Sequence, residues 1–367
     1  MTATNPTWQG MRRILCVRLD NLGDVLMTTP AMRALKNLPG RPHLTLLASS
    51  AGAAAADFLP DVDDMLRYDA AWVKNDAQGN QQDVEMVGRL RDGRYDAAVI
   101  FTVYSQSALP AALLCHLAGI PRVLAHSREN PYRLLTDWVR EREPEHGIRH
   151  EVQRQLDLVE TVGARSATTT MGWRVRQADR LGLRARLDAA GVAEQGGWIA
   201  VHPGASASSR RYPAALFAQA IAAMRHEGRR IVLLGTPADR GLQGALAGQR
   251  RLAPGLVDLS GELTLGELAA AIEAAAVLVC NNSGPAHIAA ALGVPVVDLY
   301  ALTNPQHTPW EVPHRVLFHD VPCKYCYRSV CPQGHHACLA KVAPARVAAA
   351  ARELLAGNGA PPASMAL

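Results

Sequence analysis

The sequence predicts an α/β protein of two domains, each built on a parallel sheet with helices on both faces. The first observation is length, because 367 residues exceed what one ordinary hydrophobic core holds. The second is composition, since 49% hydrophobic and 19% charged residues are typical of a well-packed globular chain. The third is an alternation of short apolar strands with amphipathic helices in both halves of the chain. That order favours parallel sheets.

The elements of the first half begin with a short apolar strand, followed by a loop and an amphipathic helix. A charged stretch over residues 144–157 becomes helical toward its end. The predicted elements before it are strands at residues 13–17, 44–48 and 96–101 and helices at 24–38 and 108–118.

The second half repeats the alternation and opens its first helix with a proline, which is favoured in the first helical turn. Its predicted elements are strands at residues 198–202, 231–234, 277–280 and 296–300 and helices at 213–225, 264–275 and 343–355.

This order suggests two Rossmann-like domains facing across a cleft, where ligands of such folds bind at the strand ends. The connection between the domains is expected between Gly163 and Gly197. We assign an N-terminal domain to residues 11–180 and a C-terminal domain to residues 190–340. A closing helix follows at 341–356, and the tail over 357–367, rich in Gly, Pro and Ala, is expected to be disordered.

The charge balance and the apolar runs exclude several classes of protein. A net charge of +5 favours an anionic substrate but is far from the pattern of a nucleic-acid-binding protein. No apolar run approaches the ~18–20 residues that span a bilayer. Residues 1–10 are polar and lack the order of a signal peptide. We therefore expect a cytoplasmic protein without a nucleic-acid partner.

A polar loop over residues 281–287, NNSGPAH, follows an apolar run and precedes a predicted helix. The first turn of a helix presents unpaired N–H donors and a partial positive charge, which suit a phosphate. His287 would lie in this turn and reach the same anion. The segment suggests a nucleotide diphosphate site, although Asn, Ser and Gly also occur at such places simply as caps and turns.

Several motifs act together along the chain. They are RLDNLGDV beginning at Arg18, VHPG ending at Gly204, SRRYP ending at Pro213, LGTP beginning at Leu234 and NNSGPAH over 281–287. In this order and at these spacings the chain resembles glycosyltransferase family 9, the lipopolysaccharide heptosyltransferases. The resemblance runs from about Arg13 to about Leu355. It implies the two-domain GT-B fold and an inverting transfer from ADP-heptose.

Asp24 matches the aspartate of the family's Gly-Asp motif, which here is Gly23-Asp24. The resemblance implies that Asp24 is the general base that takes the proton from the attacking hydroxyl. Asp24 could instead merely cap its helix, and Asp20 is a rival base from the sequence alone. Arg18 could hold either carboxylate or acidic groups of the acceptor.

Arg210 stands where the family usually has lysine, beside the loop that ends at Gly204. A cation there would neutralise the departing diphosphate, and Arg211 next to it could take over this role. The alternative is a solvated basic loop. The resemblance also places Asp239 on the ribose of the nucleotide, where its carboxylate would accept both hydroxyls.

Asn282 departs from the family, which commonly has aspartate before Ser-Gly at this place. If the aspartate of the family binds a hydroxyl or a metal, asparagine at this position would bind it more weakly. If the aspartate only shapes the loop, asparagine can do the same. Ser283, Gly284 and His287 are retained. We therefore expect the backbone amides of this loop to bind the diphosphate, with His287 as a further contact.

Four of the seven cysteines cluster late in the chain as Cys323-x2-Cys326-x4-Cys331-x6-Cys338. Such a set is consistent with a structural zinc site, and some family members carry a similar stretch. Packed thiols or a redox pair are the alternatives, because the spacing is not that of a standard two-pair zinc knuckle. In either case we expect the cluster to be peripheral to catalysis.

The sequence thus predicts a transferase that moves heptose from ADP-heptose to a lipopolysaccharide core acceptor at the inner membrane surface, where the protein would be peripheral. No metal cofactor is required for transfer, because arginine and helix amides can replace it. The alternatives are a related transferase with another sugar donor, an epimerase or hydrolase of sugar nucleotides, and a catalytically weak protein that binds nucleotide sugars.

Overall fold

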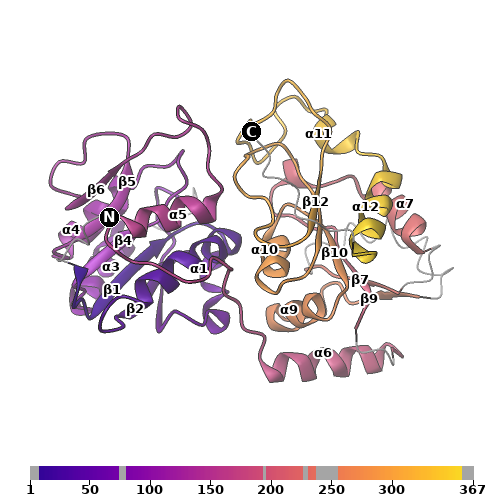
Figure 1. Cartoon of the computed structure of the whole chain (residues 1–367), viewed down its shortest axis with the longest axis horizontal. Coiled ribbons are helices and arrows are strands. Elements are labelled where there is room, and N and C mark those ends of the chain that lie inside the picture. The colour runs from indigo at the N-terminus through magenta and orange to yellow at the C-terminus, as the bar shows by residue number, and fades with distance from the viewer. Residues whose placement is uncertain (1–7, 74–79, 193–195, 226–229, 237–254, 358–367) are drawn as a thin grey trace. The chain divides into compact units, whose positions relative to one another are not determined.

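The computed structural model describes residues 8–73, 80–192, 196–225, 230–236 and 255–357. The chain divides into two compact units, residues 1–174 and 175–367, which we call the N-terminal and C-terminal units. Each unit contains one six-stranded parallel sheet (Figure 1). The predicted α/β class with two Rossmann-like sheets is therefore confirmed.

The sheet of the N-terminal unit has the strand order β3-β2-β1-β4-β5-β6. This order reverses between β1 and β4, which are hydrogen-bonded neighbours. In open α/β sheets, ligands bind at such a reversal, outside the carboxyl ends of the strands. The strands are β1 (Arg13–Arg18), β2 (His43–Ala48), β3 (Asp64–Arg67), β4 (Ala97–Ile100), β5 (Val123–Ser127) and β6 (Asp137–Arg140).

Helices cover both faces of this sheet. Leu15 and Val17 of β1 are fully buried and belong to one core with Met86 and Leu90. On α1, a second buried apolar stripe packs with α5, its neighbour in Figure 1. The helices are α1 (Leu22–Lys36), α2 (Ser50–Ala53), α3 (Asn80–Asp92), α4 (Leu109–Leu117) and α5 (Glu151–Glu160), with a 3-10 turn, η2, at Ala56–Phe58.

The sheet of the C-terminal unit has the order β12-β11-β10-β7-β8-β9. Counted from its own first strand, this is the order of the N-terminal sheet, so the reversal lies between β7 and β10. The strands are β7 (Ile199–His202), β8 (Ile231–Leu233), β9 (Leu256–Asp258), β10 (Val277–Asn281), β11 (Val296–Leu299) and β12 (His314–Leu317).

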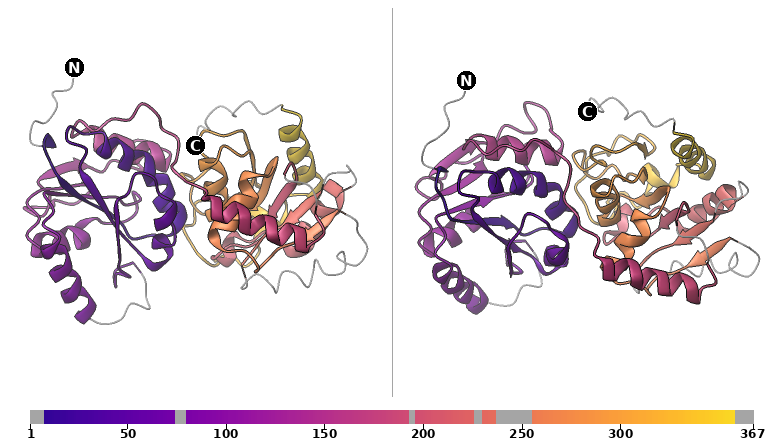
Figure 2. Two further views of the ribbon diagram at one scale, coloured as in Figure 1. Left: turned by 90° about the horizontal axis from the view of Figure 1, so that it is seen from below. Right: turned by 60° about the horizontal axis from the view of Figure 1, so that its bottom comes forward.

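The helices of the C-terminal unit pack in pairs. α7 lies against α12, and α6 lies along α9 (Figures 1 and 2). The buried apolar stripe of α12 explains why residues 344–355 form a helix that closes the core. The helices are α6 (Gln177–Ala189), η3 (Ser208–Arg210), α7 (Ala214–Arg225), α9 (Leu265–Glu273), α10 (Gly284–Ala291), α11 (Ala337–Ala340) and α12 (Pro344–Leu355).

The predicted tail over 357–367 falls, after Gly357, outside the described residues. Among the helices within the described ranges, none combines the length and the apolar composition that crossing a lipid bilayer requires.

Candidate active site

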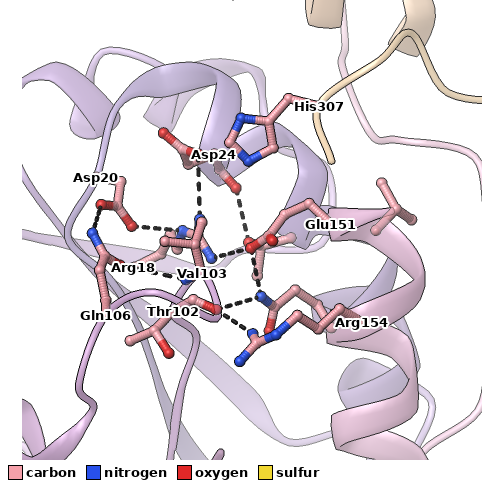
Figure 3. A network of polar contacts seen from close by, with 12 residues as sticks. Arg18, Asp20, Asp24, Thr102, Val103, Gln106, Glu151, Arg154 and His307 are labelled. Atoms are coloured by element: carbon pink, nitrogen blue, oxygen red, sulfur yellow. Dashed lines mark hydrogen bonds and ion pairs between the residues drawn. The ribbon is translucent and has the colours of Figure 1, made fainter. Parts of the chain in front are cut away.

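A buried arginine stands at the carboxyl end of β1. The side chain of Arg18 is 0% exposed and makes ion pairs with three carboxylates (Figure 3). Nε lies 3.0 Å from Asp20 Oδ2, Nη2 lies 3.3 Å from Asp24 Oδ1, and Nη1 lies 2.8 Å from Glu151 Oε1. One guanidinium therefore fixes three acidic side chains, two of which are the rival bases of the sequence.

The electrostatics of this cluster follow from one positive and three negative groups in a buried place. Burial of Arg18 opposes its charge, but Asp20, Glu151 and Asp24 together raise the pKa of the guanidinium. Burial raises the pKa of Asp20, helped by repulsion from Asp24 and Glu151, while Arg18 and Gln106 oppose the rise. The cluster thus holds more negative charge than Arg18 neutralises, which favours uptake of a proton.

Asp24 lies in the first turn of α1, where Gly23 precedes it on a buried position. Its Oδ1 pairs with Arg18, and its Oδ2 accepts a hydrogen bond of 3.1 Å from the backbone N–H of Asn21. The carboxylate therefore caps the helix and pairs with Arg18 at the same time. With 16% of the side chain exposed, it is oriented and still reachable, as a general base must be.

Glu151 was not predicted from the sequence. It lies in the first turn of α5 with its side chain fully buried, and Gln155 one turn later donates to Glu151 Oε1 at 2.7 Å. The α5 helix packs on α1, which brings a residue 133 positions away to Arg18. The available signal was an acidic residue facing the core, which needs a charged partner.

The C-terminal unit brings two predicted loops together at the carboxyl ends of β7 and β10. Asn281, the last residue of β10, links them: its Oδ1 accepts from the Tyr212 backbone N–H at 2.9 Å, and its Nδ2 donates to the Pro203 carbonyl at 2.7 Å. The loop that contains Gly204, which is buried, and Arg210, which is partly buried, therefore lies beside the loop that starts α10. Asn281 begins the predicted loop, but the sequence indicated no separate role for its side chain.

The two arginines of the first loop differ in their surroundings. Arg211 is exposed, and its Nε donates to the Ala205 carbonyl at 2.7 Å. Arg210 ends the 3-10 turn η3 and is partly buried. Burial raises the pKa of Asp298 on β11, and the positive charge of Arg210 reaches this carboxyl and opposes part of the rise. Arg210 is therefore the cation directed toward the carboxyl ends of the central strands.

The loop over residues 281–287 is buried at both ends and half-buried at its middle residues, 283–285. Asn282 Nδ2 donates to the His307 carbonyl at 3.0 Å and lies 3.4 Å from Asp298 Oδ2. The Ser283 hydroxyl donates to the Asn281 carbonyl at 3.0 Å rather than to the amides of α10. Gly284 begins α10, and His287 in its first turn is 4% exposed. Asn282 thus holds the loop in shape. The first-turn amides of α10 are groups of the kind that can bind an anion.

Asp298 is a second acidic residue that the sequence did not reveal, because its strand reads as apolar. Complete burial raises the pKa of Asp298 to about 8, although Asn282 and Arg210 oppose the rise. Asp239, expected at the ribose, lies outside the described residues.

We expect Asp298→Asn to change how stability depends on pH. The carboxyl has an ordinary pKa of 3.8 and a folded pKa of about 8. Between these values the folded chain binds the extra proton, so rising pH lowers the free energy of unfolding by about 1.4 kcal/mol per unit. The variant should be more stable than the wild type at pH 8, and the difference should shrink toward pH 5. Urea unfolding at four pH values measures this.

The control for this experiment is Asp320→Asn, because Asp320 is exposed on the same unit. It should leave the pH dependence unchanged. If the free energy of unfolding depends on pH in the same way in the wild type and in Asp298→Asn, the carboxyl of Asp298 is charged in the folded chain.

The late cysteines and two histidines line one small cavity. All seven cysteines are free thiols. Cys323 Sγ lies 3.9 Å from His335 Nε2, and burial raises the pKa of the Cys338 thiol. Within the described ranges, no three His, Cys, Asp or Glu side chains are arranged to hold a metal ion, so the structure gives structural zinc no support. The residues lining this cavity include Cys323, Cys326, Cys331, His335, His336 and Cys338.

Comparison with known proteins gives a family and a fold. Residues 84–337 match the model of glycosyltransferase family 9 (heptosyltransferase). The chain is 25% identical over 297 residues to lipopolysaccharide heptosyltransferase 3 of Escherichia coli K12, which covers 79% of this chain and 82% of that relative.

Solved structures share the fold over most of the chain, as two of them illustrate. A glycosyl transferase of family 9 from Veillonella parvula superposes with a TM-score of 0.79 at 22% identity, covering 94% of this chain and 98% of that one. The E. coli ADP-heptose lipopolysaccharide heptosyltransferase II superposes with a TM-score of 0.72 at 22% identity, covering 95% and 100%. These neighbours confirm the predicted GT-B architecture.

Proposed function

Because the chain belongs to glycosyltransferase family 9, we propose that it transfers heptose from ADP-heptose to a lipopolysaccharide core acceptor, with inversion at the sugar carbon. The family match is the observation that carries the proposal. The names of the relatives support its finer part, since a curated relative is a lipopolysaccharide heptosyltransferase and a structural neighbour is an ADP-heptose enzyme. A peripheral location at the inner membrane remains a prediction.

The proposed chemistry needs a base for the acceptor and positive charge for the leaving group. Asp24 takes the proton of the acceptor hydroxyl as its oxygen bonds to the first carbon of the heptose. The bond from that carbon to the ADP oxygen breaks, and the electron pair leaves with the diphosphate. Arg18 holds the Asp24 carboxylate in one orientation, which lowers the entropy cost of the step.

The C-terminal unit would bind the diphosphate. Amides of Gly284 and the following first turn of α10 supply donors and the positive end of a helix dipole. Arg210 adds a full charge close by, and His287 a further contact. The side chain of Asn281 joins the loop of Arg210 to the loop that starts α10. The two loops are therefore held in place before the reaction, and little rearrangement is needed when charge develops on the leaving group.

Nucleotide binding tests the proposed donor. ADP should raise the melting temperature more than UDP or GDP at equal concentration, because a ligand stabilises the native state by RT ln(1 + [L]/Kd). A tenfold affinity difference is worth about 1.4 kcal/mol at saturation, a shift of a few degrees or less in a chain of this size. A larger melting shift with UDP would contradict the ADP-heptose assignment. Equal shifts with all three nucleotides would contradict only the preference for adenine.

The cysteine cluster is expected to act on stability rather than on turnover. Cys338 packs against two apolar clusters, and its carbonyl accepts from the His319 backbone N–H at 2.8 Å. Cys338→Ser should lower the free energy of unfolding by about 1 kcal/mol, because it places a hydroxyl in a half-buried apolar site. Turnover of the folded fraction should stay within about twofold, since neither Asp24 nor Arg210 is among the residues that line the cysteine cavity.

Cys331→Ser is the matched control, because Cys331 is more peripheral to these apolar clusters. Packed thiols predict the smaller stability loss for this variant. Equal losses in both variants, together with about one metal ion per chain in elemental analysis, would show a metal site instead.

A further inference from the structure

A cavity of about 300 Å³ opens in the N-terminal unit at the carboxyl ends of β1 and β4. Its position is the reversal of strand order, where ligands of parallel sheets bind. Its volume is at the lower end of those that hold small ligands. Asp20 lines it, so it adjoins the cluster around Arg18. The proposed function leaves this cavity without an occupant.

The polar part of the cavity is held in place before any ligand arrives. Gln106 Nε2 donates to Asp20 Oδ1 at 2.7 Å, and Arg18 Nε lies 3.0 Å from Asp20 Oδ2. Figure 3 shows Asp20 between these two partners. Because each oxygen of a carboxylate accepts about two hydrogen bonds, Asp20 retains capacity for hydroxyl donors.

An aromatic side chain forms another part of the lining. Trp72 is 38% exposed although it is large and apolar. Its ring meets the buried Tyr68 edge to face, with centroids 5.7 Å apart, and the Tyr68 hydroxyl donates to Asp83 Oδ1 at 2.6 Å. The indole is therefore held by a tyrosine that is itself anchored, which leaves a firm apolar surface toward a ligand.

The charge of the lining is distinctive. None of the described residues that line this cavity is Lys, Arg or His. Arg18 is fully buried and engaged by three carboxylates, so it offers nothing to a ligand here. A different cavity of the same unit is lined by Arg140 and Arg142, beside Arg149 and Glu143, which form an ion pair, and would suit an anion better.

We propose that the cavity between Trp72 and Asp20 binds an uncharged sugar ring of the acceptor. One face of such a ring carries only C–H groups and can pack on the indole, while its hydroxyls can donate to Asp20. A ring that carries a carboxylate would meet Asp20 and, among the described residues that line the cavity, no cation. This assignment rests on the proposed transfer to a sugar hydroxyl and specifies the class of acceptor.

The same geometry connects the cavity with the proposed base. Asp20 and Asp24 bind different nitrogens of one guanidinium, Nε and Nη2. A ring bound to Asp20 would thus contact the same carboxylate cluster that contains Asp24. Trp72 and Gln106 are then specificity-determining residues for the acceptor.

Two probes that differ in a single group test the proposal. Methyl α-D-mannopyranoside is neutral, and methyl α-D-mannopyranosiduronate carries a carboxylate on the same ring. The indole N–H signal of Trp72, identified by its loss in Trp72→Phe, should shift with the neutral probe. The uronate should bind at least about tenfold more weakly, a difference of about 1.4 kcal/mol. In Asp20→Asn this discrimination should fall to within about threefold, because the charge is gone.

A matched pair of variants locates the site. Trp72→Ala should weaken the neutral probe about tenfold, whereas Trp138→Ala, which removes a similarly exposed tryptophan outside the cavity, should not. An unmoved Trp72 signal, or a uronate that binds as tightly as the neutral probe, would overturn the proposal. Thermal protection by ADP is measured in parallel on the same variants. If ADP gives no thermal protection, the proposed donor is contradicted, while the binding measurements with the two sugar probes still test the cavity.

Discussion

Asp24→Asn is expected to lower kcat by about 10²–10⁴-fold while leaving the affinity for the donor nearly unchanged. General-base help is worth this much when the proton leaves in the transition state. The asparagine side chain has nearly the same shape, and its carbonyl can still accept from the Asn21 N–H as Asp24 does. The loss should therefore come from chemistry and not from unfolding of α1. Steady-state kinetics with ADP-heptose and a core acceptor measure it.

Asp20→Asn is the comparison that separates the two rival bases, because both carboxylates touch Arg18. If Asp24 is the base, Asp20→Asn should mainly raise KM for the acceptor. The assignment fails if Asp24→Asn keeps turnover within about threefold of the wild type, well below the range for a general base. A larger fall of kcat in Asp20→Asn would move the base to Asp20.

Arg210→Ala should weaken ADP binding and lower kcat by about 10²–10³-fold, the usual effect of removing one group that stabilises developing charge. The expectation rests on the partly buried position of Arg210 and on its electrostatic reach to Asp298 beside the α10 loop. Arg210→Lys should recover most of the loss, because it keeps the charge. Calorimetry with ADP and steady-state kinetics together measure the two effects.

Arg211→Ala is the matched control, since Arg211 is the exposed neighbour that donates to the Ala205 carbonyl. It should change ADP affinity by less than about threefold, the difference expected for a screened surface charge. Unchanged ADP affinity and rate in Arg210→Ala would instead mean that its charge lies on a solvated face. A large effect in Arg211→Ala alone would transfer the role to Arg211.

Most of the central strands could be predicted because they are buried on both faces and therefore read as unbroken apolar runs. The interior strand β5 was missed although it is fully buried, because His126 and Ser127 interrupt its apolar run. Edge strands could not be predicted, since β3 and β6 are half exposed and mix charged with apolar residues. The helices α3 and α6 were missed for a related reason. Each buries only a few side chains and is otherwise polar, so its apolar stripe is weak.

The candidate site was predictable only where neighbours in sequence are neighbours in space. Arg18 and Asp24 are six positions apart on either side of one strand-to-helix turn, so their pairing follows from a local motif. Glu151 and Asp298 reach their partners through the packing of distant elements. A single sequence does not show which of its distant residues come into contact. The side-chain direction of Asn282 likewise depends on the backbone of His307, 25 positions away.

The identical strand order of the two sheets has a consequence for how this enzyme divides its work. In each unit, the functional loops follow the first and the fourth strand, the pair at which the order reverses. The same place in the architecture carries the acidic Arg18 cluster in one unit and the basic Arg210 loop in the other. Chain segments after β3 and β4, which we propose contact the acceptor, could then diverge to accept new sugars. The loops that we propose bind the diphosphate belong to a separate core and could stay unchanged. Under the proposed function, acceptor choice and donor chemistry would thereby be independent traits of one chain.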